Sequence, residues 1–123
     1  MKNAIINLTQ HVATPIQSQA GVFEPADKEL VRSVLTFRSI PTMRSLQERA
    51  NILANVAVVS NAKYAMIGGA PYLMAPLESA LLDSGITPLY SFTERVSVDT
   101  TAPDGTVTKT SAFQHAGWVE VTE

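Results

Sequence analysis

Residues 63–95 read KYAMIGGAPYLMAPLESALLDSGITPLYSFTER, a segment that predicts a strand, a tight turn, a helix and a second strand. The apolar run 64–67 is the first strand, and a glycine pair follows it. Apolar residues spaced three and four apart predict a helix over 72–84, and Gly85 supplies the left-handed residue that ends it. The bulky apolar run 86–92 is the next strand. The segment therefore predicts a βαβ unit with parallel strands and a right-handed crossover.

Length and composition predict a single domain over residues 1–123. Hydrophobic residues make up 46% of the chain and charged residues 16%, which suits a folded core and excludes a disordered or self-repelling tail. A charged fraction this low is typical of a chain whose surface is partly covered by a second subunit. We therefore expect a homodimer.

Several classes of protein are disfavoured by what the sequence lacks. No apolar run approaches the roughly 18 residues that span a bilayer, and the first residues show no signal-peptide apolar region, so we expect a cytoplasmic protein without membrane contact. The absence of cysteine removes disulfides, thiolate zinc sites and cysteine nucleophiles. A net charge of -2 and a pI of about 5.6 argue against binding to duplex nucleic acid, which needs a broad positive surface.

The elements that precede this unit complete an α/β fold. A short apolar strand is predicted at 4–8, an amphipathic helix within 21–37, and a second helix from Met43 to about Val59. Together with the βαβ unit, their order predicts a Rossmann-like, mainly parallel sheet flanked by helices.

The C-terminal part changes to an alternation with a period of two. Segments 96–100 and 106–110 flank a Pro-Asp-Gly turn and predict a C-terminal antiparallel β-hairpin. This hairpin resembles an appended arm, which covers a site or a neighbouring subunit, more than it resembles the core sheet. A last strand is predicted at 112–121, with Gly117 marking a bulge and Trp118 anchoring a core or an interface.

The candidate site lies beyond the carboxyl ends of the predicted parallel strands, where open α/β sheets bind their ligands. Three segments follow these strands directly: Thr9, Gln10 and His11; Gly68, Gly69 and Ala70; and Ser91 to Arg95. We expect the functional site where the three segments meet.

Each of these segments has a structural interpretation beside a functional one. A glycine pair before a helix lets backbone N–H groups approach a phosphate, although a tight turn alone also explains it. Its spacing matches neither the GxGxxG fingerprint nor the GxxxxGKS/T loop. His11 is either a ligand-facing group or a solvated loop residue. Arg95 either contacts a ligand or forms a surface salt bridge to Glu94 or Asp99.

The sequence contains no recognisable metal or hydrolase motif. The two histidines, His11 and His115, have neither HxxxH nor HExxH spacing. The GxSxG motif is absent, and no serine adjoins a histidine in sequence. We therefore expect no metal, no other cofactor and no Ser-His-Asp triad.

The C-terminal half carries a series of short motifs that resembles a known family. Tyr90-Ser91-Phe92-Thr93-Glu94-Arg95 ends a strand, Asp104-Gly105 turns the hairpin, and Lys109-Thr110 leads to Phe113-Gln114-His115. With Gly68 and Tyr72 at the glycine turn, the pattern is similar to that of the minimal CRISPR-associated Rossmann-fold (CARF) proteins, small ring nucleases of type III immunity. The similarity covers roughly residues 64–118, and Thr14-Pro15-Ile16-Gln17 loosely resembles the first loop of the family.

The resemblance implies a homodimer that binds a cyclic oligoadenylate, a small ring of RNA nucleotides, and cleaves it without a metal. A ribose 2′-OH would attack the adjacent phosphate while the protein holds the geometry and stabilises the developing charge. The implied catalytic residues are Thr9, His11 and Arg95. The implied ligand-binding residues are Gln10, Gly68, Gly69, Ala70, Tyr72, Ser91, Thr93 and Lys109.

Two departures from the family pattern leave other functions open. Ala116-Gly117-Trp118 stands where the family has basic residues, and the acidic residue expected beside the glycine turn is absent. Fewer basic groups weaken the case for a polyanionic ligand. The alternatives are a dimeric sensor or sponge that binds a nucleotide without turnover, and an interaction protein with no small ligand.

Overall fold

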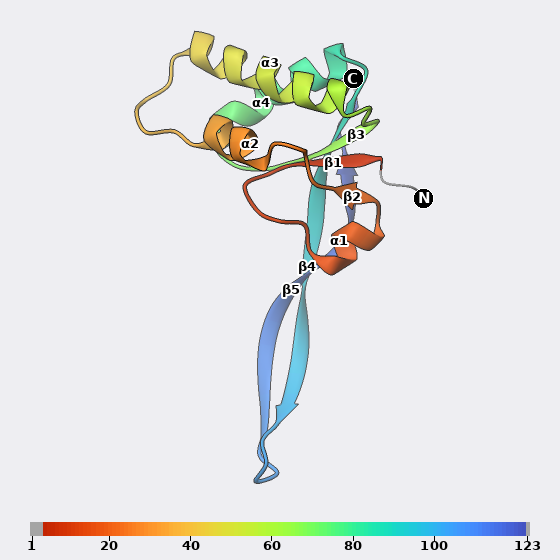
Figure 1. The fold of residues 1–123 in the computed structure, drawn as a ribbon. Coiled ribbons are helices and arrows are strands. Elements are labelled where there is room, and N and C mark those ends of the chain that lie inside the picture. Colours follow the sequence, from red (N-terminus) through yellow and green to blue (C-terminus); the bar gives the residue numbers. More distant parts are fainter. Residues whose placement is uncertain (1–3, 123) are drawn as a thin grey trace.

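The computed structural model describes residues 4–122 and shows a five-stranded sheet flanked by helices (Figure 1). In chain order the elements are β1 (Ile5–Leu8), α1 (Pro15–Gln19), β2 (Val22–Phe23), α2 (Lys28–Leu35), α3 (Met43–Val59), β3 (Tyr64–Ile67), α4 (Pro71–Asp83), β4 (Thr87–Thr101) and β5 (Val107–Glu120). The expected mixed α/β class with a C-terminal antiparallel hairpin is confirmed. The expectation about the start of the chain concerns residues 1–3, which lie outside the described range.

The strand order places a crevice at one edge of the sheet. The order is β2-β1-β3-β4-β5, with the first four strands parallel and β5 antiparallel to β4. Because β1 lies between β2 and β3, the chain first crosses to one side of β1 through α1 and then to the other side through α2 and α3. Crossovers in opposite directions leave an opening at the carboxyl ends of β1 and β3, where open α/β sheets bind ligands.

Alternation along the strands builds a separate core on each face of the sheet. One face packs on α2, α3 and α4 through buried residues that include Ile6, Leu8, Ala65 and Ile67. The other face carries a smaller cluster of Ile5, Val22, Met66 and Leu89, and α1 lies on this side (Figure 1). Trp118 is half-buried against the smaller cluster, which supports the core alternative of its predicted role as a core or interface anchor.

The helices begin where the sequence supplies a cap. Asp27 accepts a hydrogen bond from the backbone N–H of Leu30 at 3.0 Å, so α2 starts at Lys28, inside the range 21–37 predicted for this helix. The same range also holds β2, a strand of 2 residues that is too short to show a period. No helix within residues 4–122 combines the length and the apolar character that crossing a bilayer requires.

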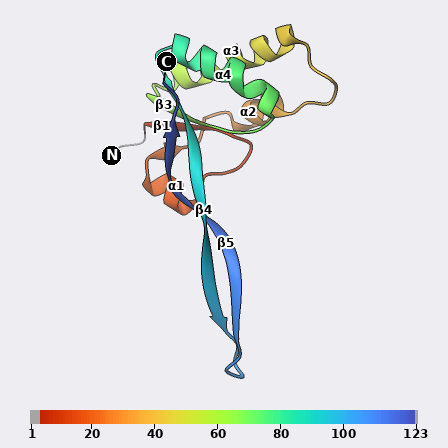
Figure 2. The same ribbon diagram turned by 180° about the vertical axis from the view of Figure 1, so that it is seen from behind.

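Beyond the core, β4 and β5 continue as a two-stranded ribbon, residues 93–115, which we call the arm (Figure 2). The prediction of an appended hairpin separate from the core strands is wrong in this respect, because each strand runs without a break from the core into the arm. Continuous pairing between β4 and β5 makes an intervening turn unnecessary. The register shifts opposite Phe92 and Thr93 and leaves Ala116 without a partner, which confirms the bulge predicted at Gly117.

Shortening the arm should leave the core folded. Replacing residues 96–112 with an Asn-Gly turn removes no residue of either core cluster. We therefore expect the free energy of unfolding in dilute solution to change by less than about 1 kcal/mol. Leu89→Ala, in the buried part of β4, should cost about 2 to 5 kcal/mol. Urea unfolding measures both, and a shortened chain that is as unstable as Leu89→Ala would show that the arm supports the core.

Candidate functional site

A cleft of about 510 Å³ lies beyond the carboxyl ends of β1 and β3 and beside the middle of β4. Its walls come from the loop after β1, the start of α1, the glycine turn after β3 and the middle of β4. The lining residues are Thr9, Gln10, His11, Val12, Thr14, Gln17, Met66, Ile67, Gly68, Gly69, Tyr90 and Ser91. The structure therefore has a cavity at the position that the order of strands and loops predicts.

The glycine turn brings the end of β3 close to the loop after β1. Gly69 has a φ of +138°, a conformation that residues with a side chain rarely adopt. A Cβ added at Gly68 would lie 3.7 Å from Cγ2 of Thr9, an ordinary van der Waals distance. Glycine is thus required at position 69 by the backbone, whereas Gly68 marks the place where the two loops touch.

A fully buried asparagine shapes the loop after β1. Asn7 Nδ2 donates to the carbonyl oxygen of His11 at 2.7 Å and to the Glu24 carboxylate at 3.0 and 3.1 Å. Asn7 Oδ1 accepts from the backbone N–H of Thr9 at 3.0 Å and from its hydroxyl at 2.7 Å. Lys28 Nζ donates to the carbonyl oxygens of Thr9 and His11 at 2.8 and 3.1 Å. These bonds engage the main chain of the loop and so fix its path along the cleft.

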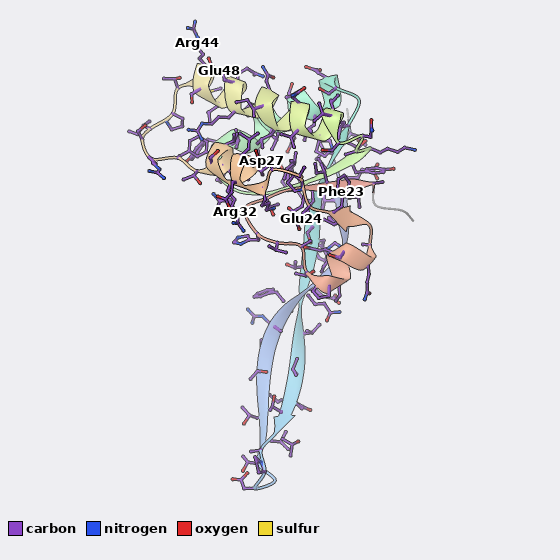
Figure 3. The ribbon with its side chains drawn as sticks, in the orientation of Figure 1. Phe23, Glu24, Asp27, Arg32, Arg44 and Glu48 are labelled. Atoms are coloured by element: carbon purple, nitrogen blue, oxygen red, sulfur yellow. The ribbon has the colours of Figure 1, made fainter. Side chains whose placement is uncertain are left out.

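Glu24 is the acid of this network (Figure 3). Its carboxylate lies 2.9 Å from Lys28 Nζ and accepts from the backbone N–H of Ala13 at 2.8 Å. Burial raises the pKa of Glu24, but the hydrogen bonds from Ala13, Asn7 and Lys28 outweigh it and hold the pKa below its ordinary value. Glu24 is therefore ionised at neutral pH and anchors the loop as a charged group.

Polar side chains from three elements meet at the β4 wall of the cleft. Ser91 Oγ lies 2.5 Å from Nδ1 of His115 on β5, and it accepts from Nε2 of Gln17 on α1 at 3.2 Å. Burial lowers the pKa of His115, which favours the neutral imidazole. A hydroxyl and an imidazole thus stand in contact at the edge of the cleft.

The structure gathers around the cleft six of the residues that the sequence analysis singled out: Thr9, Gln10, His11, Gly68, Gly69 and Ser91. Two others lie at the start of α4. Ala70 is the N-cap of that helix, and the ring of Tyr72 packs edge to face on Phe37 with 5.1 Å between centroids. Tyr72 lines a separate hollow beside the loop between α2 and α3.

The remaining three, Thr93, Arg95 and Lys109, lie on the arm. Alternate residues of a strand share a face, so Thr93 and Arg95 continue the face that Ser91 presents. Lys109 stands farther out, opposite Asp99. The cleft and the inner arm therefore form one continuous strip of candidate residues.

Arg95 has an aromatic partner on the arm. Its guanidinium carbon lies 5.4 Å from the ring centroid of Phe113, directly across the ribbon. Among residues 4–122, neither Glu94 nor Asp99 forms a salt bridge with it. The structure thus leaves the positive charge of Arg95 without a carboxylate partner in the described chain.

Sequence reasoning missed half of the cleft. Met66 and Ile67 end the predicted strand 64–67, and Tyr90 directly precedes the candidate segment that begins at Ser91, so the sequence neighbours of the candidate segments included all three. The signal for Thr14 and Gln17 was the loose resemblance of residues 14–17 to the first loop of the CARF family, which assigned them no role. The contact between Ser91 and His115 was also missed, because they lie 24 residues apart and the comparison of serines with histidines considered sequence neighbours alone.

The described residues do not form a metal centre. Within 4–122 no three His, Asp or Glu side chains come together in a group that could hold a metal ion. The chemistry available at the cleft is therefore that of hydroxyl, imidazole, amide and backbone N–H groups.

Comparison with known proteins identifies the family. Residues 3–119 match the model of the uncharacterized protein MJ1673 family. The chain belongs to this family. No curated protein and no solved structure matches the chain. The family match spans the loop after β1, the glycine turn and most of both arm strands, so the residues of the cleft lie inside the region that the family shares.

Removing the charge of Glu24 should weaken the dependence of stability on pH. The pKa of Glu24 is lower in the folded chain than its ordinary value of 4.5, so its charge contributes stability that is complete above 4.5 and is lost as the pH falls through the folded pKa. Between about pH 5 and pH 3, we expect the melting temperature of Glu24→Gln to fall less than that of the native chain.

Glu29→Gln is the matched control for this measurement. Glu29 lies at the surface with its side chain 85% exposed, paired with Arg32 at 3.2 Å, and should keep the native pH dependence. Thermal unfolding across the pH series compares the variants. If the melting temperature of Glu24→Gln falls with acidic pH as steeply as that of the native chain, the carboxylate does not anchor the loop.

Proposed function

We propose that this chain binds a cyclic oligoadenylate at the cleft and cleaves the ring without a metal, by attack of a ribose 2′-OH on the neighbouring phosphate. The observation that carries the proposal is the meeting of the loop after β1, the glycine turn after β3 and the middle of β4 in one cleft, at the carboxyl ends of β1 and β3. The resemblance of residues 64–118 to the minimal CARF ring nucleases supports this class of ligand. On this proposal the protein acts in the cytoplasm.

The cleft offers groups that suit one nucleotide of such a ring. Its volume lies within the usual range of small-molecule sites. Val12, Met66 and Ile67 provide apolar surface for a base, and the backbone N–H groups of the glycine turn suit a phosphate oxygen. The Thr9 hydroxyl already donates to Asn7, so it faces a ligand as an acceptor and suits a ribose hydroxyl.

The rest of the ring would extend from the cleft along the arm. Ser91, Thr93 and Arg95 are spaced about 7 Å apart on one face of β4, as alternate residues of a strand are. Arg95 carries the first positive charge along this face, and a guanidinium can bind a phosphate through two hydrogen bonds. The strip thus provides polar and cationic contacts for a ligand larger than the cleft.

Binding without turnover is a second candidate, favoured by the charges around the cleft. Neither lysine nor arginine is among the described lining residues. Lys28 is nearby, but its ammonium is engaged by Glu24 and by the loop carbonyls. Stabilisation of a phosphoryl transition state would then depend on Arg95 and on neutral donors. A sponge that holds the ring needs less of this stabilisation than a nuclease does.

Incubation with cyclic oligoadenylates of different ring size separates the two candidates. A ring nuclease should cleave at least one ring in the presence of EDTA and leave a 2′,3′-cyclic phosphate, because the ligand's own 2′-OH is the nucleophile. A 2′-deoxy ring should bind and remain intact. Recovery of every bound ring uncleaved would support the sponge instead. Cleavage that EDTA abolishes and magnesium restores would contradict the mechanism.

Arg95→Ala should impair turnover more than binding. If Arg95 stabilises the charge of the transition state, its removal should cost about 2 to 4 kcal/mol of that stabilisation. Arg44→Ala is the matched control, since Arg44 is an exposed arginine at the far end of α3 from the arm (Figure 3). Single-turnover rates and ligand affinity measure the two effects. A native rate in Arg95→Ala would move the role to Lys109 or to another donor.

The arm also supports the proposal of a homodimer. Phe113 is 70% exposed, Val107 57% and Val98 44%, and a two-stranded ribbon by itself is marginally stable in water. Packing of the arm on a second copy would bury these side chains within a two-fold assembly. Light scattering over a dilution series should report a dimer. A monomer at high micromolar concentration would exclude a site shared between subunits.

A further inference from the structure

The donor and acceptor in each hydrogen bond between Gln17, Ser91 and His115 follow from the chemistry of the groups. Gln17 Oε1 accepts from the backbone N–H of Thr14 at 3.0 Å, in the capping box of α1, so the amide turns its Nε2 toward Ser91. Nε2 is a donor only, and Ser91 Oγ therefore receives this bond. The hydroxyl proton of Ser91 then points to Nδ1 of His115, 2.5 Å away. Gln17 thus orients the serine as a donor to the imidazole.

The bulge in β5 brings His115 onto the correct face. Residues three apart in a regular strand point to opposite faces of a sheet. His115 and Trp118 are three apart, but Ala116 between them has no partner on β4. Trp118 therefore pairs with Ser91 and His115 pairs with Thr93, two residues farther along β4, so both side chains lie on the face of Ser91. The rings of His115 and Trp118 consequently lie together, with 4.4 Å between centroids. The imidazole is held by an aromatic neighbour while its Nδ1 faces the hydroxyl.

We propose that Ser91 and His115 form the proton-accepting pair of the cleft. Ser91 Oγ takes the proton of the attacking ribose 2′-OH while its own proton passes to Nδ1 of His115. The 2′-oxygen then forms a bond to phosphorus, the bond from phosphorus to the 5′-oxygen breaks, and the 5′-oxygen takes a proton from water. His115 returns its proton to solvent, so the reaction is a ring opening with no net uptake of water. This assignment rests on the proposed function and names the group that activates the nucleophile.

The surroundings of the pair suit a base. Burial is what lowers the pKa of His115, and a neutral imidazole accepts a proton at neutral pH. The titratable side chains on the adjoining segments are His11 after β1, Tyr90, Glu94, Arg95 and Asp99 on β4, and Lys109 and Glu120 on β5; α1 carries none. Among residues 4–122 none of these bonds to the His115 ring. The basicity of His115 is therefore governed by burial and by Ser91.

Titration of the two histidines by NMR tests the pair without a ligand. His115→Gln assigns the resonances, and His115 in the native chain should titrate below its ordinary value of 6.5. Ser91 donates to the neutral ring and so stabilises the neutral form, which means that Ser91→Ala should raise the pKa of His115. A lowered pKa in Ser91→Ala would show that the ring donates to the serine, and it would overturn the proposal.

Kinetics on a cyclic oligoadenylate test the role in the reaction. Ser91→Ala and His115→Gln should each slow ring opening by roughly 100-fold or more, while ligand affinity changes far less. Ser91→Thr, which keeps the hydroxyl, should recover much of the rate and shows that the site is still folded. Ser97→Ala, at an exposed serine farther along β4, is the control and should cleave at the native rate. In His115→Gln the fall in rate at acidic pH should disappear.

The outcomes distinguish this proposal from the function on which it rests. A native chain that binds no cyclic oligoadenylate refutes the proposed function and this assignment with it. A native chain that binds the ring without cleaving it supports the sponge and removes the need for a base. If Ser91→Ala and His115→Gln both cleave the ring at the native rate, the assignment of the pair is refuted. The proposed function is then unaffected. Slowed cleavage in both variants with the expected NMR shift supports the pair.

Discussion

A single buried amide connects the fold of this protein to its candidate site. Asn7, the next-to-last residue of β1, has no exposed surface, and each polar atom of its side chain finds a partner in the loop after β1 or in Glu24. Leaving such a group without partners would cost about 1 to 3 kcal/mol, so the loop can scarcely leave its place while the strand stays buried. Because β1 lies between β2 and β3, the loop is held at the point where the crossovers diverge. The sheet and the cleft therefore depend on the same hydrogen bonds.

The arm gives the antiparallel strand a second role. An exposed two-stranded ribbon adds little stability by itself, and most of its residues lie outside both core clusters. Its inner end nevertheless adjoins the cleft, since β5 carries His115 to Ser91, which lines the cleft on β4. The bulge at Ala116 adjusts the phase of β5 between its core half, where Trp118 packs, and its outer half. An irregularity in the pairing thus decides which side chains reach the cleft.

The scarcity of charge limits the kind of recognition that the cleft can perform. The chain has a net charge of -2, and the nearest ammonium, that of Lys28, is used to hold the loop. A ligand in the cleft meets hydroxyl, amide and backbone donors beside apolar side chains. Recognition of this kind depends on shape and on the placement of hydrogen bonds more than on attraction between charges. Within residues 4–122, Arg32 also bonds to this loop, through the carbonyl oxygen of Gln10, and Arg95 and Lys109 bring further positive charge on the arm.

The sequence by itself determined the βαβ unit, the helices α3 and α4, and the three segments that meet at the cleft, because periodicity, glycine positions and strand ends are local signals. It also marked the bulge at Gly117. Only the tertiary structure decided that β4 runs unbroken into the arm, that β2 and α1 exist, and that Gln17, Ser91 and His115 come together. These features depend on the register between strands that are distant in the chain. Register is set by the whole length of pairing and by one unpaired residue, and no local pattern of residues records it.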